Sequence, residues 1–251
     1  MTLARFIFCE WLKLKRSKIV LFSAVSVCTT PFMLFIEALQ THFEHPEQSF
    51  TLADIYSNGL LYGMLLINMM IYVAITAYLF SREYTQRTLK TILPIPISRS
   101  SFLTSKFLVQ FIWIMILMGI TWMGIFLLFG LYHIMIGLDG FQITIAFVWL
   151  IKMLLGGIFM FITLSPFAYL SLKSKGIVVP VIVSAVIVMG NAALSNQDLG
   201  ALYPWTGTYF IMMKKTLSTN YPIWLSLTII ILIAMIGFIC TYTYFKKEDL
   251  K

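Results

Sequence analysis

The chain has 251 residues, of which 60% are apolar and only 11% are charged, and its mean hydropathy is +0.90. A soluble globular protein has about 25% charged residues, so this composition excludes a soluble enzyme, a disordered chain and a secreted disulfide scaffold. The formal net charge of +8 does not indicate a nucleic-acid partner, because in a membrane protein the position of the positive charges matters more than their number.

The first segment, residues 1–18, is predicted to form a basic amphipathic helix. On a helical wheel its apolar and basic side chains fall on opposite sides, which is typical of a helix that lies in the membrane interface and faces anionic lipid headgroups. Glu10, beside Trp11, lies at the edge of the apolar face, where a carboxylate is poorly solvated. Glu10 therefore either pairs with Lys13, three residues further on, or contacts another subunit.

Six apolar stretches are each predicted to cross the membrane, since about 20 apolar residues span the ~30 Å hydrocarbon core as a helix. They are residues 19–36, 55–80, 107–131, 143–172, 177–194 and 223–245. Pro166 is expected to kink the fourth stretch or end it early. The predicted fold is an all-α polytopic membrane protein with one transmembrane domain, residues 1–251.

The basic residues indicate how the chain is oriented. Fifteen of the 18 Lys and Arg residues lie before the first stretch, after the second, after the fourth or after the sixth. Six spans place both termini on one side, and the positive-inside rule makes that side cytoplasmic.

A polar stripe follows the second stretch, where Asn68, Tyr72 and Thr76 recur at four-residue spacing. Hydrogen bonding between helices, at about 0.6 kcal/mol per contact, is one explanation. A wall of a translocation path for substrate is the other.

The cytoplasmic segment of residues 81–101 is predicted to contain a short amphipathic helix. Ser81 can cap its start, and Pro94 should stop it. Its contact residues are predicted to be Glu83, Tyr84, Arg87, Thr88, Leu89 and Ile92. Glu83 and Arg87 either pair with each other or contact charges on a partner. Lipid or a cytoplasmic partner can cover the apolar face.

Residues 195–221 form the longest outer segment, and they are rich in aromatic side chains. Pro204 and Gly207 make this segment a poor transmembrane helix, whereas Trp and Tyr favour the headgroup zone. A re-entrant or interfacial piece before the last span is one interpretation, and a loop on the bilayer surface is the other.

Two motifs resemble ABC-2-type permeases, the membrane subunits of ATP-driven exporters. The pattern Glu83-Tyr84-x-x-x-Thr88-Leu89-Lys90-x-x-Leu93-x-x-Pro96-x-Ser98-Arg99 is similar to the coupling-helix region of the family. Glu10-Trp11-Leu12-Lys13-Leu14-Lys15-Arg16-Ser17-Lys18 is similar to its N-terminal interfacial helix. Arg87 departs from the pattern, because many members have Gly there. The resemblance covers essentially the whole chain, and the short loops are most similar to permeases of lantibiotic immunity, bacitracin resistance and peptide-toxin export.

The resemblance implies the partners of the chain. It implies a separate ATPase subunit that holds ATP and Mg, a second permease copy in a homodimer or heterodimer, and an amphipathic peptide as substrate. It also implies a multi-pass protein of the bacterial cytoplasmic membrane with no cofactor of its own. The helix after the second span would dock on the ATPase.

Two other classes are weighed against this interpretation, an intramembrane enzyme and a secondary transporter. The sequence contains no P-loop of the form G-x-x-x-x-G-K-[ST], no H-E-x-x-H and no G-x-S-x-G. An ion-coupled transporter usually has charges within its spans, and only Lys152 qualifies. A span that begins near Trp149 would let Lys152 reach outward. His42 and His45 suit a solvated loop better than a metal site, and no metal site is predicted.

Overall fold

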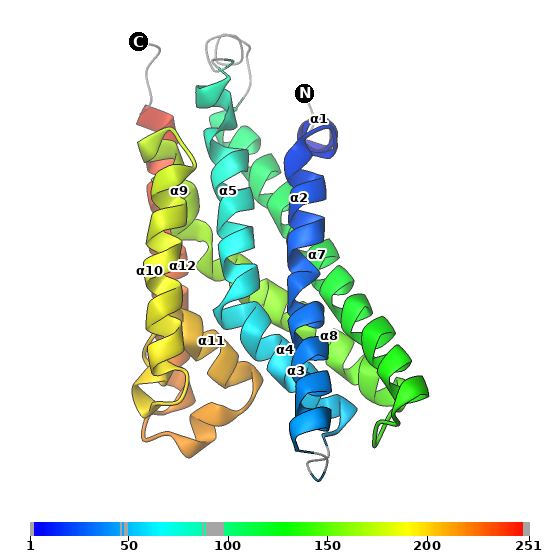
Figure 1. Ribbon diagram of the computed structural model, residues 1–251. Helices are drawn as coiled ribbons and strands as arrows, with labels where there is room; N and C mark the ends of the chain where they lie inside the picture. The colour runs from blue at the N-terminus through cyan, green and yellow to red at the C-terminus, as the bar shows by residue number, and fades with distance from the viewer. Residues whose placement is uncertain (1–2, 46, 48–49, 87, 89–97, 248–251) are drawn as a thin grey trace.

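The computed structural model describes residues 3–45, 47, 50–86, 88 and 98–247 (Figure 1). Regular structure in this part of the chain is helical, apart from one isolated bridge between Thr51 and Asp139. In chain order the elements are α1 (Leu3–Lys15), α2 (Lys18–Val27), α3 (Thr29–Glu44), α4 (Leu52–Leu65), α5 (Ile67–Thr85), α7 (Arg99–Met135), α8 (Ile143–Thr163), α9 (Ser165–Ser174), α10 (Val178–Leu194), η1 (Asp198–Ala201), α11 (Pro204–Met212), η2 (Lys215–Ser218) and α12 (Ile223–Lys247).

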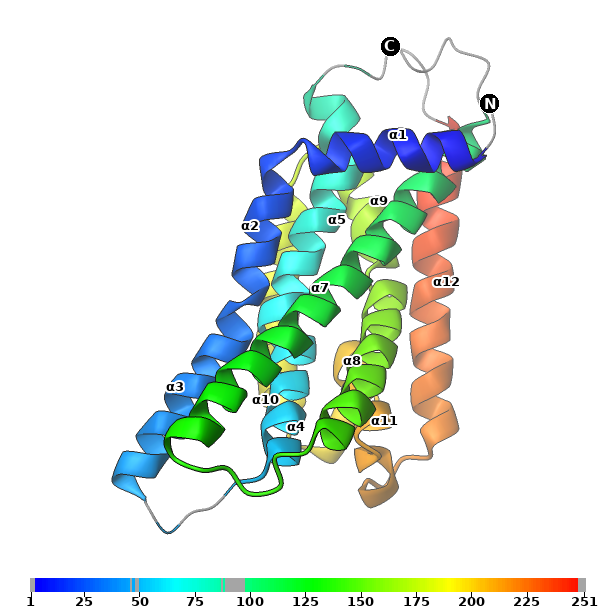
Figure 2. The same ribbon diagram turned by 90° about the vertical axis from the view of Figure 1, so that its right-hand side faces the viewer.

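Five helical segments are long and apolar enough to cross a bilayer, which confirms the prediction of an all-helical polytopic membrane protein. Two of them are pairs of consecutive helices, α2 with α3 and α4 with α5, and the others are α7, α8 and α12. A further apolar helix, α10, is shorter at 17 residues. The long helices run side by side, whereas α1 lies across one end of the bundle (Figures 1 and 2).

The fourth apolar stretch is broken where the sequence predicts it. Helix α8 ends at Thr163 and α9 begins at Ser165, with Pro166 in its first turn, where the missing N–H of a proline costs no hydrogen bond. Ser165 donates its hydroxyl to the carbonyl of Ala234 on α12 at 3.0 Å. The two helices approach closely at Gly237, where an added Cβ would lie 2.5 Å from the backbone nitrogen of Pro166.

A second break, between α4 and α5, has no proline near it in the sequence. Leu66 leaves the helical region with φ −121° and ψ −82°. A break in a transmembrane helix frees backbone groups that no water can reach, so other groups must satisfy them. The Nδ2 of Asn191 on α10 donates to the carbonyl oxygen of Leu65 at 2.8 Å.

The ends of two helices differ from the expected ones. Helix α5 continues without interruption to Thr85, so the prediction that Ser81 caps a new helix is wrong: Ser81 is fully buried inside α5. Helix α7 begins at Arg99 rather than near residue 107, because Ser98 accepts a hydrogen bond from the backbone N–H of Ser101 and caps it.

The outer segment of residues 195–221 contains η1, α11 and η2. Helix α11 packs against α4, α8, α10 and α12 at the end of the bundle opposite the termini (Figure 1). Buried side chains include Thr206, Tyr209 and Phe210. Helix α11 is therefore packed into the bundle. Whether the segment is re-entrant or lies on the bilayer surface stays a prediction.

Candidate functional site

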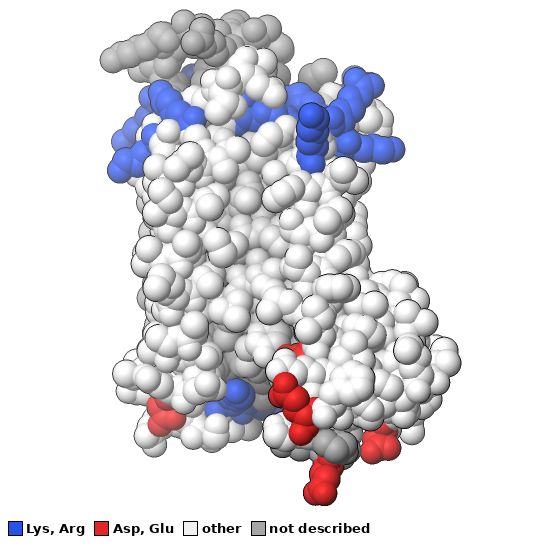
Figure 3. Space-filling model, viewed as in Figure 1, with Lys and Arg blue, Asp and Glu red and all other residues white. Residues whose placement is uncertain are grey.

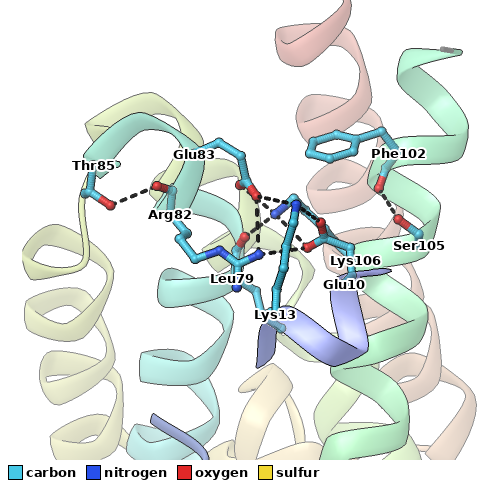
Figure 4. Close-up of polar contacts among 9 residues, drawn as sticks. All are labelled: Glu10, Lys13, Leu79, Arg82, Glu83, Thr85, Phe102, Ser105 and Lys106. Carbon is cyan, nitrogen blue, oxygen red and sulfur yellow. Dashed lines mark hydrogen bonds and ion pairs between the residues drawn. The ribbon is translucent and has the colours of Figure 1, made fainter. Parts of the chain in front are cut away.

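Five charged side chains meet where α1, α5 and α7 come together (Figure 4). The Lys106 Nζ on α7 lies 2.6 Å from Glu83 Oε2 on α5 and 3.3 Å from Glu10 Oε2 on α1. The Arg82 Nη2 lies 3.4 Å from Glu10 Oε2, and the Lys13 Nζ lies 2.7 Å from Glu10 Oε1. We call Glu10, Lys13, Arg82, Glu83 and Lys106 the ionic cluster. It joins three helices that are far apart in the sequence.

Four members of the ionic cluster are buried, and only Lys13 is exposed. Lys106 is 1% exposed, and its Nζ also donates to the carbonyl of Leu79 and lies 5.0 Å from the Phe102 ring centroid. Removing a charge from water costs several kcal/mol unless an opposite charge and hydrogen bonds compensate. The three cations and two carboxylates therefore stabilise one another, and none of the buried members can be removed without leaving another uncompensated.

The Glu10 carboxyl is the centre of the ionic cluster. Burial alone would raise its pKa, but the charge of Lys106, the hydrogen bond and charge of Lys13, and the charge of Arg82 together lower the pKa to about 2. The carboxylate is therefore ionised at neutral pH and holds the three cations in place.

The structure bears on both expectations for Glu10. Its pairing with Lys13 is present, and its other oxygen is occupied by Arg82 and Lys106 of the same chain. The neighbouring Trp11 ring packs edge-on against Trp113 of α7, with ring centroids 6.0 Å apart. Both residues thus attach α1 to the bundle, while a contact with another subunit stays a prediction.

The sequence reasoning missed Arg82 and Lys106 as partners. The predicted third stretch starts at residue 107 and leaves Lys106 just outside it, although this residue lies inside α7. The signal was present in the second apolar stretch, which continues into Ser81 and Arg82 with no proline or glycine to end the helix. A helix that extends one turn further carries Arg82 and Glu83 to the level of α1.

The predicted coupling residues begin within the ionic cluster, at Glu83, and continue along the chain after it. Glu83 belongs to it, Tyr84 lies in the last turn of α5, and the backbone N–H of Thr88 donates to the carbonyl of Glu83 at 3.0 Å. The Tyr84 ring lies 5.4 Å from the Lys175 Nζ. Arg87, Leu89 and Ile92 lie outside the described residues, and so does the predicted stop at Pro94.

The polar stripe of α5 faces the interior of the chain. Thr30 donates to Asn68 Oδ1 at 3.3 Å, and Gln110 Nε2 donates to Thr76 Oγ1 at 2.8 Å. Asn68, Tyr72 and Thr76 are all fully buried. These contacts support hydrogen bonding between helices, and a role in a substrate path stays a prediction.

The Asn191 side chain makes a second group of neutral polar contacts between helices. Its Nδ2 satisfies the Leu65 carbonyl at the α4–α5 break, and its Oδ1 accepts a hydrogen bond from Thr206 of α11 at 3.2 Å. One buried amide therefore fixes the broken span, α10 and α11 to one another. No sequence pattern singled it out.

The remaining candidates are Lys152 and the two histidines near the end of α3. Helix α8 begins at Ile143, and Lys152 lies within it with its Nζ 3.9 Å from the centroid of the Trp149 ring. A membrane span that begins near Trp149 and lets Lys152 reach outward stays a prediction. The His42 ring packs against Tyr132 at 6.5 Å. Among the described residues, no group of three or more His, Cys, Asp or Glu is placed to hold a metal ion.

Comparison with known proteins gives two matches. Residues 6–191 match the model of the ABC-2 family transporter protein. The chain is also 33% identical, over 207 residues, to the bacitracin transport permease protein BCRB of Bacillus licheniformis. That alignment covers 82% of this chain and 97% of the relative. The family match over residues 6–191 includes every member of the ionic cluster.

Proposed function

Because the chain belongs to the ABC-2 family of transporter permeases, we propose that it is one membrane-spanning half of an exporter that expels an amphipathic peptide. It is the membrane subunit and not itself an ATPase, and family membership implies a partner ATPase subunit that hydrolyses the ATP. Two permease copies, as a homodimer or a heterodimer, complete the proposed assembly. ATP and Mg bind to the ATPase and no cofactor binds to this chain.

In the proposed topology, six spans place both termini in the cytoplasm of a bacterium. Most Lys and Arg side chains in Figure 3 gather at the end where the termini lie, and the visible Asp and Glu side chains lie at the opposite end. The positive-inside rule supports the orientation. Helix α10 is the short fifth span, about 25 Å long at 1.5 Å per residue, and α11 is the re-entrant outer segment.

The topology can be tested by cysteine labelling. In a variant that lacks Cys9, Cys28 and Cys240, a Gln197→Cys substitution should react with an impermeant maleimide added outside intact cells. A Lys246→Cys substitution should react only after the membrane is permeabilised. The reverse pattern would contradict the orientation.

The ionic cluster carries the proposal for coupling. It fixes the end of α5 to α1 and α7 immediately before residues 86–98, so a push on that segment would move three helices together rather than bend one. In this proposal Tyr84, Thr88, Leu89 and Ile92 fill an apolar groove of the ATPase, and Arg87 contacts its rim. In this proposal Glu83 does not enter the groove. It connects the contact residues to α7, because its carboxylate lies 2.6 Å from the Lys106 Nζ.

The proposed substrate class rests on the relative. A permease named for bacitracin transport is 33% identical over nearly its whole length, so an amphipathic antimicrobial peptide is the substrate class to test first. Resistance to such a peptide, self-immunity and peptide-toxin export use the same transport step in different hosts.

Reconstitution tests the proposed function. The permease and its ATPase subunit in proteoliposomes should move bacitracin only with ATP, and Leu89→Asp should abolish peptide-stimulated ATP hydrolysis. Leu217→Asp is a matched control, since Leu217 is exposed at the opposite end of the molecule. Transport by the purified chain with no ATPase would reject the proposal and favour a secondary transporter. Normal export by Leu89→Asp, at wild-type membrane levels, would reject the docking role alone.

A further inference from the structure

A basic cavity lies at the elbow where α1 turns into α2, beside the end of α5. Its volume is about 770 Å³, within the range of small-ligand sites. Among the described residues that line it, Lys13, Arg16, Lys18 and Arg82 are cations, and none is Asp or Glu.

The cations in this cavity are only partly neutralised. Lys13 and Arg82 lie 2.7 and 3.4 Å from Glu10 and 4.0 and 3.6 Å from Glu83, but these two carboxylates also pair with Lys106. Arg16 and Lys18 have no ion pair with any residue that the structure describes. The elbow therefore has an excess of positive charge that an anion from outside the chain can neutralise.

The start of α2 adds to this preference for an anion. Ser17, Lys18 and Ile19 line the cavity at the first turn of the ten-residue α2, and the Ser17 side chain does not cap it. The first N–H groups of a helix have no partner within the helix, and they carry the positive end of its dipole. Phosphate groups bind at such helix ends together with basic side chains.

The position of the cavity identifies the source of the anion. Helix α1 lies across the bundle, and α2 runs along it (Figure 2), so the elbow is at the level of the lipid headgroups in the proposed topology. Ile19 and Tyr78 give the cavity an apolar side, and Tyr78 lies one helical turn deeper than Arg82. A phosphate with apolar chains attached fits this arrangement better than a free phosphate.

We propose that the α1–α2 elbow is a binding site for a phosphate group, and that the phosphate is that of an anionic phospholipid in the same leaflet. Arg16 and Lys18 provide its main charges, and Ile19 and Tyr78 contact the start of the acyl chains. A bound lipid would fix α1 to the membrane surface at the point where the ionic cluster fixes it to the bundle. The cavity shares Thr88 with the proposed ATPase contact, whereas Arg16 and Lys18, which provide its main charges, are not among the residues proposed for that contact.

The test uses the full chain, purified in detergent and delipidated, with short-chain phosphatidylglycerol as the probe in native mass spectrometry. A double variant, Arg16→Gln with Lys18→Gln, should weaken lipid binding at least tenfold. The control, Arg5→Gln with Lys15→Gln, removes the same two residue types from the exposed face of α1 outside the cavity, and it should change binding less than threefold. The charge-conserving swap Arg16→Lys with Lys18→Arg should retain binding and show that the elbow still folds.

A second arm uses inorganic phosphate. If phosphate alone binds with the same dependence on Arg16 and Lys18 and phosphatidylglycerol does not, the site holds a soluble phosphate instead of a lipid. Equal weakening of lipid binding by both double variants would mean diffuse attraction to the whole basic end and would overturn the site. Absence of binding by either probe, or loss of binding in the charge-conserving swap, would overturn it as well.

Discussion

Helices α5 and α7 are joined at two depths by contacts of opposite character. At the end near the termini, Lys106 and Glu83 form a buried ion pair at 2.6 Å. Deeper in the bundle, Gln110 and Thr76 form a neutral hydrogen bond at 2.8 Å, and both of these residues are also buried. The two contacts lie within about two turns of each other on the same pair of helices.

The two contacts differ in the free-energy cost of losing one partner. A neutral hydrogen bond between helices in a membrane contributes about 0.6 kcal/mol, because the freed group often finds another partner. A buried charge that loses its partner costs about 3–5 kcal/mol. The ionic cluster therefore tolerates only one arrangement of α1, α5 and α7, whereas the deeper contacts allow the helices to shift. A rigid end and an adjustable middle suit the proposed transmission of motion from an ATPase.

Lys106→Met should have the largest effect. It leaves Glu10 and Glu83 buried with fewer cations, and we expect a loss of about 3–5 kcal/mol in the free energy of unfolding. Unfolding in mixed detergent–SDS micelles measures this loss of free energy. In proteoliposomes, peptide-stimulated ATP hydrolysis should fall together with export.

A double variant separates charge from packing. Glu83→Gln with Lys106→Met removes both members of the closest pair, so its loss of stability should be clearly smaller than the sum of the two single losses. If the two single losses simply add, the Glu83–Lys106 pair does not stabilise the packing of α5 against α7. That result would contradict the proposed difference between the ionic and the neutral contacts.

Acid should weaken the ionic cluster and leave the deeper contacts intact. The pKa of Glu10 is lowered from 4.5 to about 2 in the folded chain, so its contribution is fully present above pH 4.5 and is lost as the pH falls toward 2. That shift corresponds to about 3 kcal/mol. A Glu10→Gln variant should lack this part of the pH dependence of unfolding, and an unchanged profile in the variant would contradict the role of Glu10.

The contacts at the two depths also differ in how well the sequence predicts them. The α5 stripe is visible as Asn68, Tyr72 and Thr76, because polar residues at four-residue spacing stand out in an apolar helix. Of the ionic cluster, only the pairing of Glu10 with Lys13 is predicted, since the other members come from two further segments and their pairing depends on how α1 crosses the bundle. Composition and charge predict the helical membrane fold and the break near Pro166. They do not predict the break at Leu66, because a distant amide on α10 stabilises it.

Asn191→Leu should have an intermediate effect. It leaves the Leu65 carbonyl and the Thr206 hydroxyl without their partner at the α4–α5 break, and a buried unsatisfied group costs about 1–3 kcal/mol. The same unfolding experiment measures it. Asn220→Leu is the matched control, since the Asn220 side chain makes an exposed hydrogen bond to Asp198, and its stability should be unchanged. Equal losses in the two variants would show that the break does not depend on the amide.

Thr76→Val should have the smallest effect on stability. Valine keeps the shape of threonine and removes the oxygen that accepts from Gln110, so we expect a loss of about 0.6 kcal/mol. Export is the sharper measurement, because the stripe has two explanations. If it only joins helices, Thr76→Val should transport the same peptides at wild-type rates. If the stripe lines the substrate path, the order in which a set of peptides is exported should change while stability stays near that of the wild type. A loss of several kcal/mol would contradict both, since it would make the neutral contact as indispensable as the ion pair of Lys106 with Glu83.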